Sequence, residues 1–440
     1  MSIDIPETNF PRVVIVGGGF GGIQLAKNLK NKEVQVLMID KHNYHTFQPL
    51  LYQVATGGLE PDSIAFPLRK VFKHQKNFVF RVANVEKVHP TEKYLETSIG
   101  EIPYDYLVIA TGSTTNFFGN TEIESNSMPM KSIPEALNLR SLILQSFEEA
   151  LLRDSINEQE ALMNFVIVGG GPTGVETAGA LAELKSHVLP NDYPDLDLRR
   201  MQINLVESAP RLLSSMSPQA SKQAESFLKE MGVNVRTNDL VVSYNGTTVE
   251  LKSGRKLETT NLIWSAGVKG SVIEGINPEV LVRGNRIKTD SYNRVSGYEN
   301  IFAIGDVAAM ITEETPNGHP GVAQVAIQQG KLLSKNIINL INNRELKAFS
   351  YLDLGSMATV GRNKAVVDLP FIRFQGIFAW FVWMFLHLLF LVGFRNKLVV
   401  LVNWIWNYFS YDRGTRLIIR PYRKNKDVMD EERNLVHAKL

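Results

Sequence analysis

The sequence contains no cysteine. This absence excludes disulfide bonds, thiolate metal ligands, cysteine nucleophiles and every redox reaction that passes through a dithiol. Charge of one sign is also lacking, because 47 lysines and arginines nearly balance 45 aspartates and glutamates, so no global field indicates nucleic acid as a partner. Residues 1–11 lack the apolar core of a secretory signal. We therefore predict no metal site, and a protein that stays in the cytoplasm or on a membrane face that looks into it.

A glycine-rich turn near the N-terminus follows a run of four β-branched residues, 13–16. The turn consists of Gly17, Gly18, Gly19, Phe20, Gly21 and Gly22. Its G-x-G-x-x-G spacing lets backbone approach a pyrophosphate, which then faces the free N–H groups at the start of the helix predicted over 23–29. A second strand, 34–39, ends at Asp40, whose carboxylate can accept from ribose hydroxyls. Strand, turn, helix and acid together favour dinucleotide binding over a bare structural turn.

A second copy of this pattern begins at residue 165. A strand over 165–168 runs into Gly169, Gly171 and Gly174 at the same spacing, and residues 175–184 continue as a helix. The next strand, 202–206, ends at Glu207, thirty-three residues after Gly174 instead of about twenty. We attribute the extra length to an insertion at 185–200. Two such units in one chain make a chance match improbable and predict two nucleotide sites.

Five further segments have the composition of ligand-binding loops or faces. Residues 42–53 form an aromatic, proline-broken stretch that is either a packed surface loop or a wall over a flat cofactor ring. The strand that ends at 110–112 and the one that ends at 265–267 both stop in small residues, which allow backbone to approach a ligand. An apolar strand at 300–304 leads into Gly305 and Asp306, and a helix over 321–341 places Gln324 and Gln328 on one face.

The chain becomes strongly apolar after residue 371. Residues 376–394 contain only His387 as a clearly polar side chain, and nineteen residues at about 1.5 Å each would span a bilayer core. Dense aromatic residues with Arg395 and Lys397 between the two apolar segments suit helices that lie on a membrane surface equally well. A hydrophobic dimer interface is the third reading. The basic residues predicted to attract anionic headgroups are Arg413, Arg416, Arg420, Arg423, Lys424 and Lys426.

Together these motifs resemble the flavoproteins with two dinucleotide-binding domains, and in particular type II NADH:quinone oxidoreductase. The resemblance is carried by the two glycine motifs, the segment 45–57, the helix residues 323–328 and the tail 385–417. It implies an α/β fold with two Rossmann-like domains, the second inserted in the first, and a C-terminal membrane-anchoring helical segment. The implied boundaries are 1–118 and 284–346 for FAD, 119–283 for NADH and 347–440 for membrane association.

The resemblance also implies roles for individual residues. The non-covalent FAD would be bound by Gly17, Gly18, Gly19, Phe20, Gly21, Gly22, Asp40, Lys41, Gln48, Thr111, Gly112, Asp306 and Gln324. NADH would be bound by Gly169, Gly171, Thr173, Gly174, Glu176, Glu207, Ala266 and Gly267. Gln324 and Gln328 would offer amide donors to the quinone, and Glu207 would disfavour a 2′-phosphate, although Arg211 lies nearby in sequence.

Glu176 and Lys364 are the candidate catalytic residues, as a pair that controls proton delivery. Each residue has an alternative role that involves no catalysis. Glu176 would be a partner of the helix dipole, and Lys364 would be a solvated lysine. We expect a homodimer that lies on the cytoplasmic face of the cell inner membrane, contacts lipid through residues 371–426 and reduces a membrane quinone without pumping protons. A reductase of a soluble ferredoxin or rubredoxin carrier and a non-catalytic FAD- and NAD-binding membrane protein are the alternatives. Sulfide:quinone oxidoreductase chemistry needs the cysteines that the chain lacks.

Overall fold

The chain divides into two compact units, each assembled from three stretches of sequence. The computed structural model describes residues 5–411 and 413–423. Unit 1 contains residues 1–46, 65–114 and 268–354, and unit 2 contains residues 47–64, 115–267 and 355–440. Both units are α/β, which confirms the predicted fold class.

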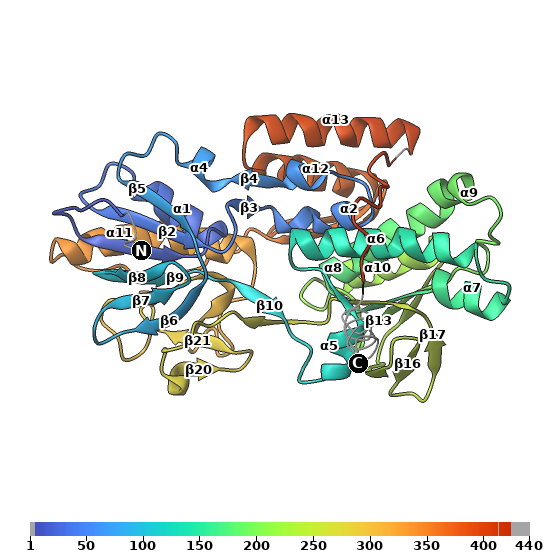
Figure 1. Cartoon of the computed structure of the whole chain (residues 1–440), viewed down its shortest axis with the longest axis horizontal. Coiled ribbons are helices and arrows are strands. Elements are labelled where there is room, and N and C mark those ends of the chain that lie inside the picture. Colours follow the sequence, from blue (N-terminus) through green and yellow to red (C-terminus); the bar gives the residue numbers. More distant parts are fainter. Residues whose placement is uncertain (1–4, 412, 424–440) are drawn as a thin grey trace, which may run out of the picture. The chain divides into compact units, whose positions relative to one another are not determined.

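A five-stranded parallel sheet forms the centre of unit 1 (Figure 1). Its strand order is β22 (Ile301–Ala303), β9 (Tyr106–Ile109), β1 (Arg12–Val16), β2 (Gln35–Asp40) and β5 (Phe78–Val82). Helices α1 (Phe20–Asn28) and α11 (Ala323–Ile341) pack against each other, and Gly330 lies so close to Gly21 that an added Cβ would meet the Gly21 carbonyl oxygen at 2.5 Å. The β-branched residues of β1 are buried because both faces of a parallel sheet are covered.

Smaller elements complete unit 1. The strands are β3 (Tyr44–Thr46), β4 (Ala65–Pro67), β6 (Val85–His89), β7 (Tyr94–Thr97), β8 (Gly100–Pro103), β10 (Ser113–Thr115), β19 (Val268–Gly270), β20 (Leu281–Val282), β21 (Arg286–Thr289) and β23 (Ala308–Met310). The helical turns are α4 (Leu68–Val71), η3 (Pro278–Val280) and η4 (Gly305–Val307).

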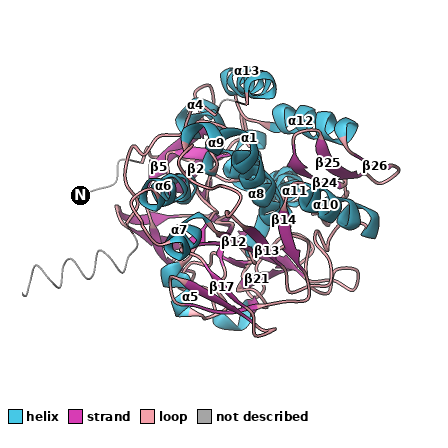
Figure 2. Cartoon of the chain, turned by 90° about the vertical axis from the view of Figure 1, so that its right-hand side faces the viewer, coloured by secondary structure: helices cyan, strands magenta, loops and turns pink. Residues whose placement is uncertain are grey.

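Unit 2 repeats the parallel sheet in the order β11 (Met128–Pro129), β18 (Asn261–Trp264), β12 (Phe165–Val168), β13 (Ile203–Val206) and β14 (Val233–Arg236). The strand that precedes each glycine motif, β1 or β12, is therefore central in its sheet. Helices α8 (Pro172–Glu183) and α10 (Pro218–Glu230) lie beside the strands β13 and β14 (Figure 2). Helix α8 also touches β24 (Ser356–Gly361), and the approach is so close that a Cβ on Gly179 would meet the Val360 carbonyl oxygen at 1.5 Å.

The remaining elements of unit 2 surround this sheet. Its helices are η1 (Gln48–Leu50), α2 (Leu51–Ala55), α3 (Pro61–Ile64), α5 (Thr121–Asn126), α6 (Ile133–Ala150), α7 (Ile156–Met163), the π-helical turn η2 (Leu184–Val188), α9 (Leu189–Asp192), α12 (Ile377–Phe390) and α13 (Phe394–Ser410). Its further strands are β15 (Val241–Tyr244), β16 (Thr248–Leu251), β17 (Lys256–Glu258), β25 (Lys364–Asp368) and β26 (Arg373–Gln375).

The apolar run 376–394 does not form one helix. Helix α12 ends at Phe390, the chain is extended at Leu391, and Gly393 adopts a φ of 90° before α13 begins. Within residues 5–411 and 413–423, no helix combines the length and the apolarity that crossing a membrane requires. The reading of this run as a continuous nineteen-residue helix is therefore wrong.

The two compact units divide the chain at other places than the predicted domain boundaries, which stay a prediction. Residues 268–283 belong to unit 1 because Ile273, Ile276 and Val280 pack into its hydrophobic core, so the chain returns to unit 1 before residue 284. Residues 47–64 belong to unit 2, where α2 packs on α6 and α8. Residues 347–354 belong to unit 1, and the C-terminal segment that follows shares unit 2 with the second glycine motif.

Candidate functional site

A carboxylate holds the first glycine turn. Asp40 accepts a hydrogen bond from the Gly18 backbone N–H at 2.6 Å through Oδ2, and from the His42 N–H at 2.7 Å through Oδ1. Because a carboxylate has about four acceptor sites, Asp40 retains capacity for a ribose hydroxyl while it fixes the turn. The position of Asp40 at the end of β2, next to β1, is what brings it to the turn.

The spaces around the glycines fit a pyrophosphate. A Cβ on Gly17, which has a φ of 112°, would meet the Ala110 carbonyl oxygen at 2.3 Å, and one on Gly22 would meet the Gly17 carbonyl oxygen at 2.0 Å. In contrast, nothing lies within 4 Å of the Cβ position of Gly19, the residue that precedes α1. No side chain caps the start of α1, because Gly19 has none, and the start of a helix suits an anion.

One residue that the sequence analysis did not select, His45, supports this turn. His45 is buried, its Nδ1 lies 3.0 Å from the Gly18 carbonyl oxygen, and its ring packs edge-on against Phe20. Burial lowers the pKa of His45 to about 4, so the ring is neutral at physiological pH and its Nδ1–H can donate to Gly18. The aromatic composition of residues 42–53 was the only sequence signal for this role.

The Gly-Asp turn of unit 1 is fixed by a glutamine that sequence analysis missed. Gln329 is buried, and its Oε1 accepts from the Gly305 N–H at 2.8 Å. Asp306 accepts from the Ser113 hydroxyl at 2.6 Å, and the Thr111 hydroxyl donates to the Ser271 carbonyl oxygen at 2.5 Å. Thr111 and Gly112 thus both bond to the backbone of Ser271, and Asp306 bonds to Ser113, the residue that follows Gly112.

The two glutamines predicted to bind quinone lie in different environments. Gln324 is at the first turn of α11 and is half-buried. Gln328 is committed to the backbone of Leu352, because its Nε2 donates to the Leu352 carbonyl oxygen at 2.9 Å and its Oε1 accepts the Leu352 N–H at 3.0 Å. The structure thus shows a loop-fixing role for Gln328, and the pair does not offer two unengaged amides.

The second glycine turn reproduces the first in unit 2. Glu207 accepts from the Gly170 N–H at 2.5 Å and from the Ala209 N–H at 2.6 Å. A Cβ on Gly174 would meet the Gly169 carbonyl oxygen at 1.9 Å, while nothing lies within 4 Å of the Cβ position of Gly171. The long spacing to Glu207 arises because α8 continues through η2 and α9, followed by a loop, before β13 begins.

Arg211 is engaged away from Glu207. Its Nη1 donates to the Met216 carbonyl oxygen at 2.7 Å and to the Ser221 hydroxyl at 2.6 Å, and its Nη2 donates to the Ser214 carbonyl oxygen at 2.6 Å. These bonds close the loop after β13. This geometry therefore does not support a role for Arg211 in binding a 2′-phosphate.

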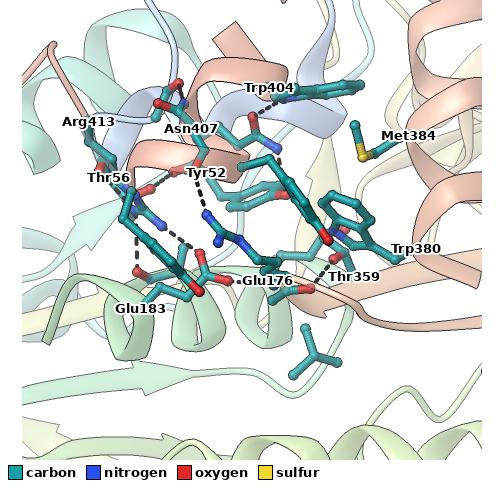
Figure 3. Close-up of a pocket in the computed structure, with 18 of the residues that line it drawn as sticks. Tyr52, Thr56, Glu176, Glu183, Thr359, Trp380, Met384, Trp404, Asn407 and Arg413 are labelled. Atoms are coloured by element: carbon teal, nitrogen blue, oxygen red, sulfur yellow. Dashed lines mark hydrogen bonds and ion pairs between the residues drawn. The ribbon is translucent and has the colours of Figure 1, made fainter. Parts of the chain in front are cut away.

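Glu176 lies in the wall of two cavities in unit 2. The small cavity has a volume of about 360 Å³ and is lined by Gln48, Pro49, Leu51, Tyr52, Met130, Lys131, Thr173 and Glu176. The aromatic cavity, of about 800 Å³ including its mouth, is bounded by α2, α8, α12, α13 and the end of β24 (Figure 3). Besides Tyr52, five aromatic side chains line it, Trp380, Trp383, Trp404, Tyr408 and Tyr411, and Met384 adds to its apolar wall.

The carboxyl group of Glu176 is buried, and burial favours its protonated form over the carboxylate. The residue is 8% exposed, and burial raises the pKa of Glu176 well above its usual range. The backbone of Thr359 and the indole of Trp383 oppose this shift only in part. The group can therefore give a proton, which is the property required of a general acid.

Lys364 does not pair with Glu176, and this prediction is wrong. The Lys364 ammonium donates to the Glu230 carboxylate at 2.6 Å and lies over the ring of Phe227. Both partners are on α10, because β25 packs against that helix. The structure gives Lys364 the role of a surface ion pair.

The C-terminal basic cluster is also engaged within the protein. Arg413 donates to Glu183 at 2.7 Å in a largely buried pair, and Arg416 pairs with Asp192 at 2.7 Å. Arg420 donates to Asn138 at 3.1 Å. These contacts fix the segment after α13 on α8, α9 and α6, and the attraction of anionic headgroups to this cluster stays a prediction. Lys424 and Lys426 lie outside the described residues.

Arg413→Ala is expected to destabilise the protein by about 3 kcal/mol, because it leaves Glu183 buried without its cation. The measurement is the free energy of unfolding in denaturant. The matched control is Arg416→Ala, whose pair with Asp192 is more exposed and is expected to contribute less than about 1 kcal/mol. Equal losses for the two variants would contradict the assignment of a buried clamp to Arg413.

Comparisons with known proteins agree with this geometry. Residues 11–330 match the family model for pyridine nucleotide-disulphide oxidoreductase, and residues 354–411 match the model for the NDH2 C-terminal domain. The type II NADH:quinone oxidoreductase Ndh of Mycobacterium tuberculosis is 37% identical over 422 residues, covering 92% of this chain and 89% of the relative. The type II NADH:quinone oxidoreductase of Haemophilus influenzae is 32% identical over 416 residues, covering 85% of this chain and 92% of the relative.

The fold is similar to a solved relative as well. The structure of NDH2 from Plasmodium falciparum in complex with NADH has a TM-score of 0.85 at 22% identity, and the match covers 93% of this chain and all of that one, 100%. The sequence resemblance is confirmed by the family models and by the relatives. The chain belongs to the type II NADH:quinone oxidoreductase family.

Proposed function

We propose that this protein oxidises NADH with FAD as its bound cofactor and reduces a membrane quinone to quinol without pumping protons. The observation that carries the proposal is the aromatic cavity, which has the buried carboxyl group of Glu176 in its wall and is bounded by α12 and α13, two helices with apolar outward faces. FAD supplies the chemistry that accepts hydride and gives up two electrons. The protein binds and orients the reactants and provides the proton.

Unit 1 supports FAD binding through its glycine turn. The open space at Gly19 and the uncapped start of α1 suit the pyrophosphate, and Asp40 lies where a ribose would follow. Thr111, Gly112 and Asp306 form the set proposed for the flavin side, together with Gln324. Phe20 lies within the glycine turn and Lys41 directly follows Asp40, and both are proposed FAD residues.

Unit 2 supports NADH binding in the same way. The open space at Gly171 suits the pyrophosphate, and the Glu207 carboxylate suits ribose hydroxyls while it repels a 2′-phosphate. Ala266 and Gly267 end the strand beside the glycine turn, and Thr173 lines the small cavity with Gln48 and Glu176. We propose that the small cavity receives the reacting part of the bound NADH, beside the carboxyl group of Glu176.

The aromatic cavity is the proposed quinone site. Its tryptophan and tyrosine rings suit a flat quinone ring, and Arg362, stacked on Tyr408 and Tyr411, places a cation in the same wall. Gln324 stays a proposed quinone residue, whereas the Gln328 amide is committed to Leu352. Glu176 is the proposed proton donor to a quinone oxygen.

The outward faces of α12 and α13 are the proposed lipid contact. In α12 the buried residues Ala379 and Trp383 lie one turn apart, and in α13 Asn396, Val400 and Trp404 do the same. The exposed large apolar residues of this region include Phe378, Phe381, Phe385, Leu389, Phe394, Leu398, Val402, Ile405, Trp406 and Phe409. An apolar face of this size suits the interface of a bilayer. We therefore propose a peripheral protein on the cytoplasmic face of the inner membrane, and a homodimer.

Anaerobic mixing of the yellow holoprotein with NADH, followed by a soluble quinone, tests the proposed function. We expect the flavin absorbance to bleach with NADH and to recover with the quinone. Bleaching without recovery, combined with rapid reduction of a ferredoxin or rubredoxin, would favour a reductase of soluble carriers. A flavin that NADH does not bleach would indicate a non-catalytic protein.

Glu207→Gln is expected to weaken the preference for NADH over NADPH about tenfold, or roughly 1.4 kcal/mol, because the neutral amide no longer repels a 2′-phosphate. The measurement is the ratio of kcat/KM for the two nucleotides. Glu250→Gln, which removes a surface carboxylate of β16 that pairs with Lys256, is the control and should leave the ratio as it is. A native protein that prefers NADPH would overturn the assignment of Glu207.

Phe378→Glu with Phe409→Glu is expected to lower binding to uncharged phosphatidylcholine vesicles at least about tenfold, since each phenylalanine would lose roughly 1.5–3 kcal/mol of apolar burial. Vesicle flotation measures the bound fraction. Leu152→Glu is the control, because Leu152 is 81% exposed, as Phe409 is at 80%, but belongs to neither α12 nor α13. Binding that survives the double substitution, or that requires anionic lipid, would argue against this face.

A further inference from the structure

Tyr52 and Glu176 line both cavities of unit 2. Tyr52 is on α2 and is buried, and Glu176 is on α8, against which α2 packs. Because both side chains border the same two cavities, the two groups lie near each other. A tyrosine and an acid thus form the wall that separates the small cavity from the aromatic cavity.

The orientation of the Tyr52 hydroxyl follows from its neighbour Gln53. The Trp404 indole N–H lies 2.8 Å from the Gln53 Oε1, and because an indole can only donate, this atom is the amide oxygen. The Gln53 Nε2 then donates to the Tyr52 hydroxyl oxygen at 2.8 Å. The Tyr52 hydroxyl oxygen therefore accepts a hydrogen bond from Gln53, and the Tyr52 O–H bond points away from Gln53.

Trp404 brings this orientation under the control of α13. Its side chain is buried against α2, whereas the neighbouring Ile405 and Trp406 are exposed on the proposed lipid face. Two hydrogen bonds thus connect Trp404 on α13 to Gln53, and Gln53 to Tyr52. The orientation of the Tyr52 hydroxyl therefore depends on α13 being packed against α2. Figure 3 shows Trp404, Tyr52 and Glu176 around the aromatic cavity.

We infer that Tyr52 passes a proton to Glu176 during quinone reduction, and that Gln53 is the positioning residue that aims the Tyr52 hydroxyl. The inference rests on the proposed function. NADH, one proton and a quinone give NAD⁺ and a quinol, so one proton has to come from water. Glu176 gives its carboxyl proton to a reduced quinone oxygen, the Tyr52 O–H bond breaks as its proton moves to the Glu176 carboxylate, and Tyr52 regains a proton from water.

The charged groups around this wall allow the transfer. Glu183 and Arg413 also act on Tyr52, but they neutralise each other as an ion pair. Lys131 lines the small cavity, where it faces the same wall. Burial raises the pKa of Tyr52 well above 10, so the hydroxyl remains protonated between transfers and acts as a relay.

Tyr52→Phe tests the inference through the ratio of quinone turnover to ferricyanide turnover, because ferricyanide takes electrons without protons. We expect the ratio to fall tenfold or more and the loss to deepen as the pH rises, since general acid catalysis contributes about 100-fold or more. Gln53→Leu should give a smaller loss, and the double variant should be no worse than Tyr52→Phe. In the oxidised protein, the infrared C=O band of protonated Glu176 should shift in both single variants.

Tyr244→Phe is the matched control, because it removes another buried hydroxyl of unit 2, one that donates to the Gly246 carbonyl oxygen at 3.0 Å. It should change neither the ratio nor the band. If Tyr52→Phe fails to bind FAD, Gln53→Glu replaces it, because a carboxylate accepts from both Trp404 and Tyr52, turns the Tyr52 proton away from Glu176 and should lower the ratio.

The inference is overturned by an unchanged ratio and band in Tyr52→Phe, or by losses that add in the double variant, which would make Gln53 merely structural. A native protein that NADH bleaches but that no quinone reoxidises would instead defeat the proposed function, and the inference with it. The two failures are distinct, because the first is seen in a protein whose native form does reduce quinone.

Discussion

A carboxyl group buried without a cation is the constraint on which this structure depends. Among the described residues, only a backbone group and an indole lower the pKa of Glu176, and burial raises it further than they can offset. The aromatic rings that line the larger cavity exclude water from this acid, and they come from the same helices that present apolar residues outward. The proposed quinone site and the proposed lipid contact therefore depend on the same two helices, α12 and α13, which are apolar on both faces.

The glycine turns of the two units are held in the same way. In each, the acid at the end of the second strand accepts the N–H of the glycine that follows the first, Asp40 with Gly18 and Glu207 with Gly170. In each, the third motif glycine approaches the first so closely that a Cβ cannot fit. The turn is thus organised before a ligand arrives, which reduces the ordering that binding has to pay for.

Sequence predicted the features that depend on local pattern, and missed those that depend on long-range contacts. Both glycine turns, their strands and the acids Asp40 and Glu207 follow from spacing alone. The pairing of Lys364 with Glu230 and the clamp of Arg413 on Glu183 join residues more than 100 positions apart, so no periodicity reveals them. The break at Leu391 to Gly393 was hidden because leucine, valine and glycine continue an apolar run without continuing a helix. Gln329 was passed over for Gln328, since composition cannot tell which amide is buried.

The central claim, that burial raises the pKa of Glu176, has a thermodynamic test. An acid whose folded pKa is raised stabilises the protein most below its unfolded pKa of about 4.3, and this contribution is lost as the pH rises toward the folded pKa. The measurement is the difference in unfolding free energy between the native protein and Glu176→Gln as a function of pH. The account predicts that this difference falls with rising pH above about 4.5, by up to roughly 1.4 kcal/mol per pH unit. A difference that is flat from acid to neutral pH, or that grows, would contradict it.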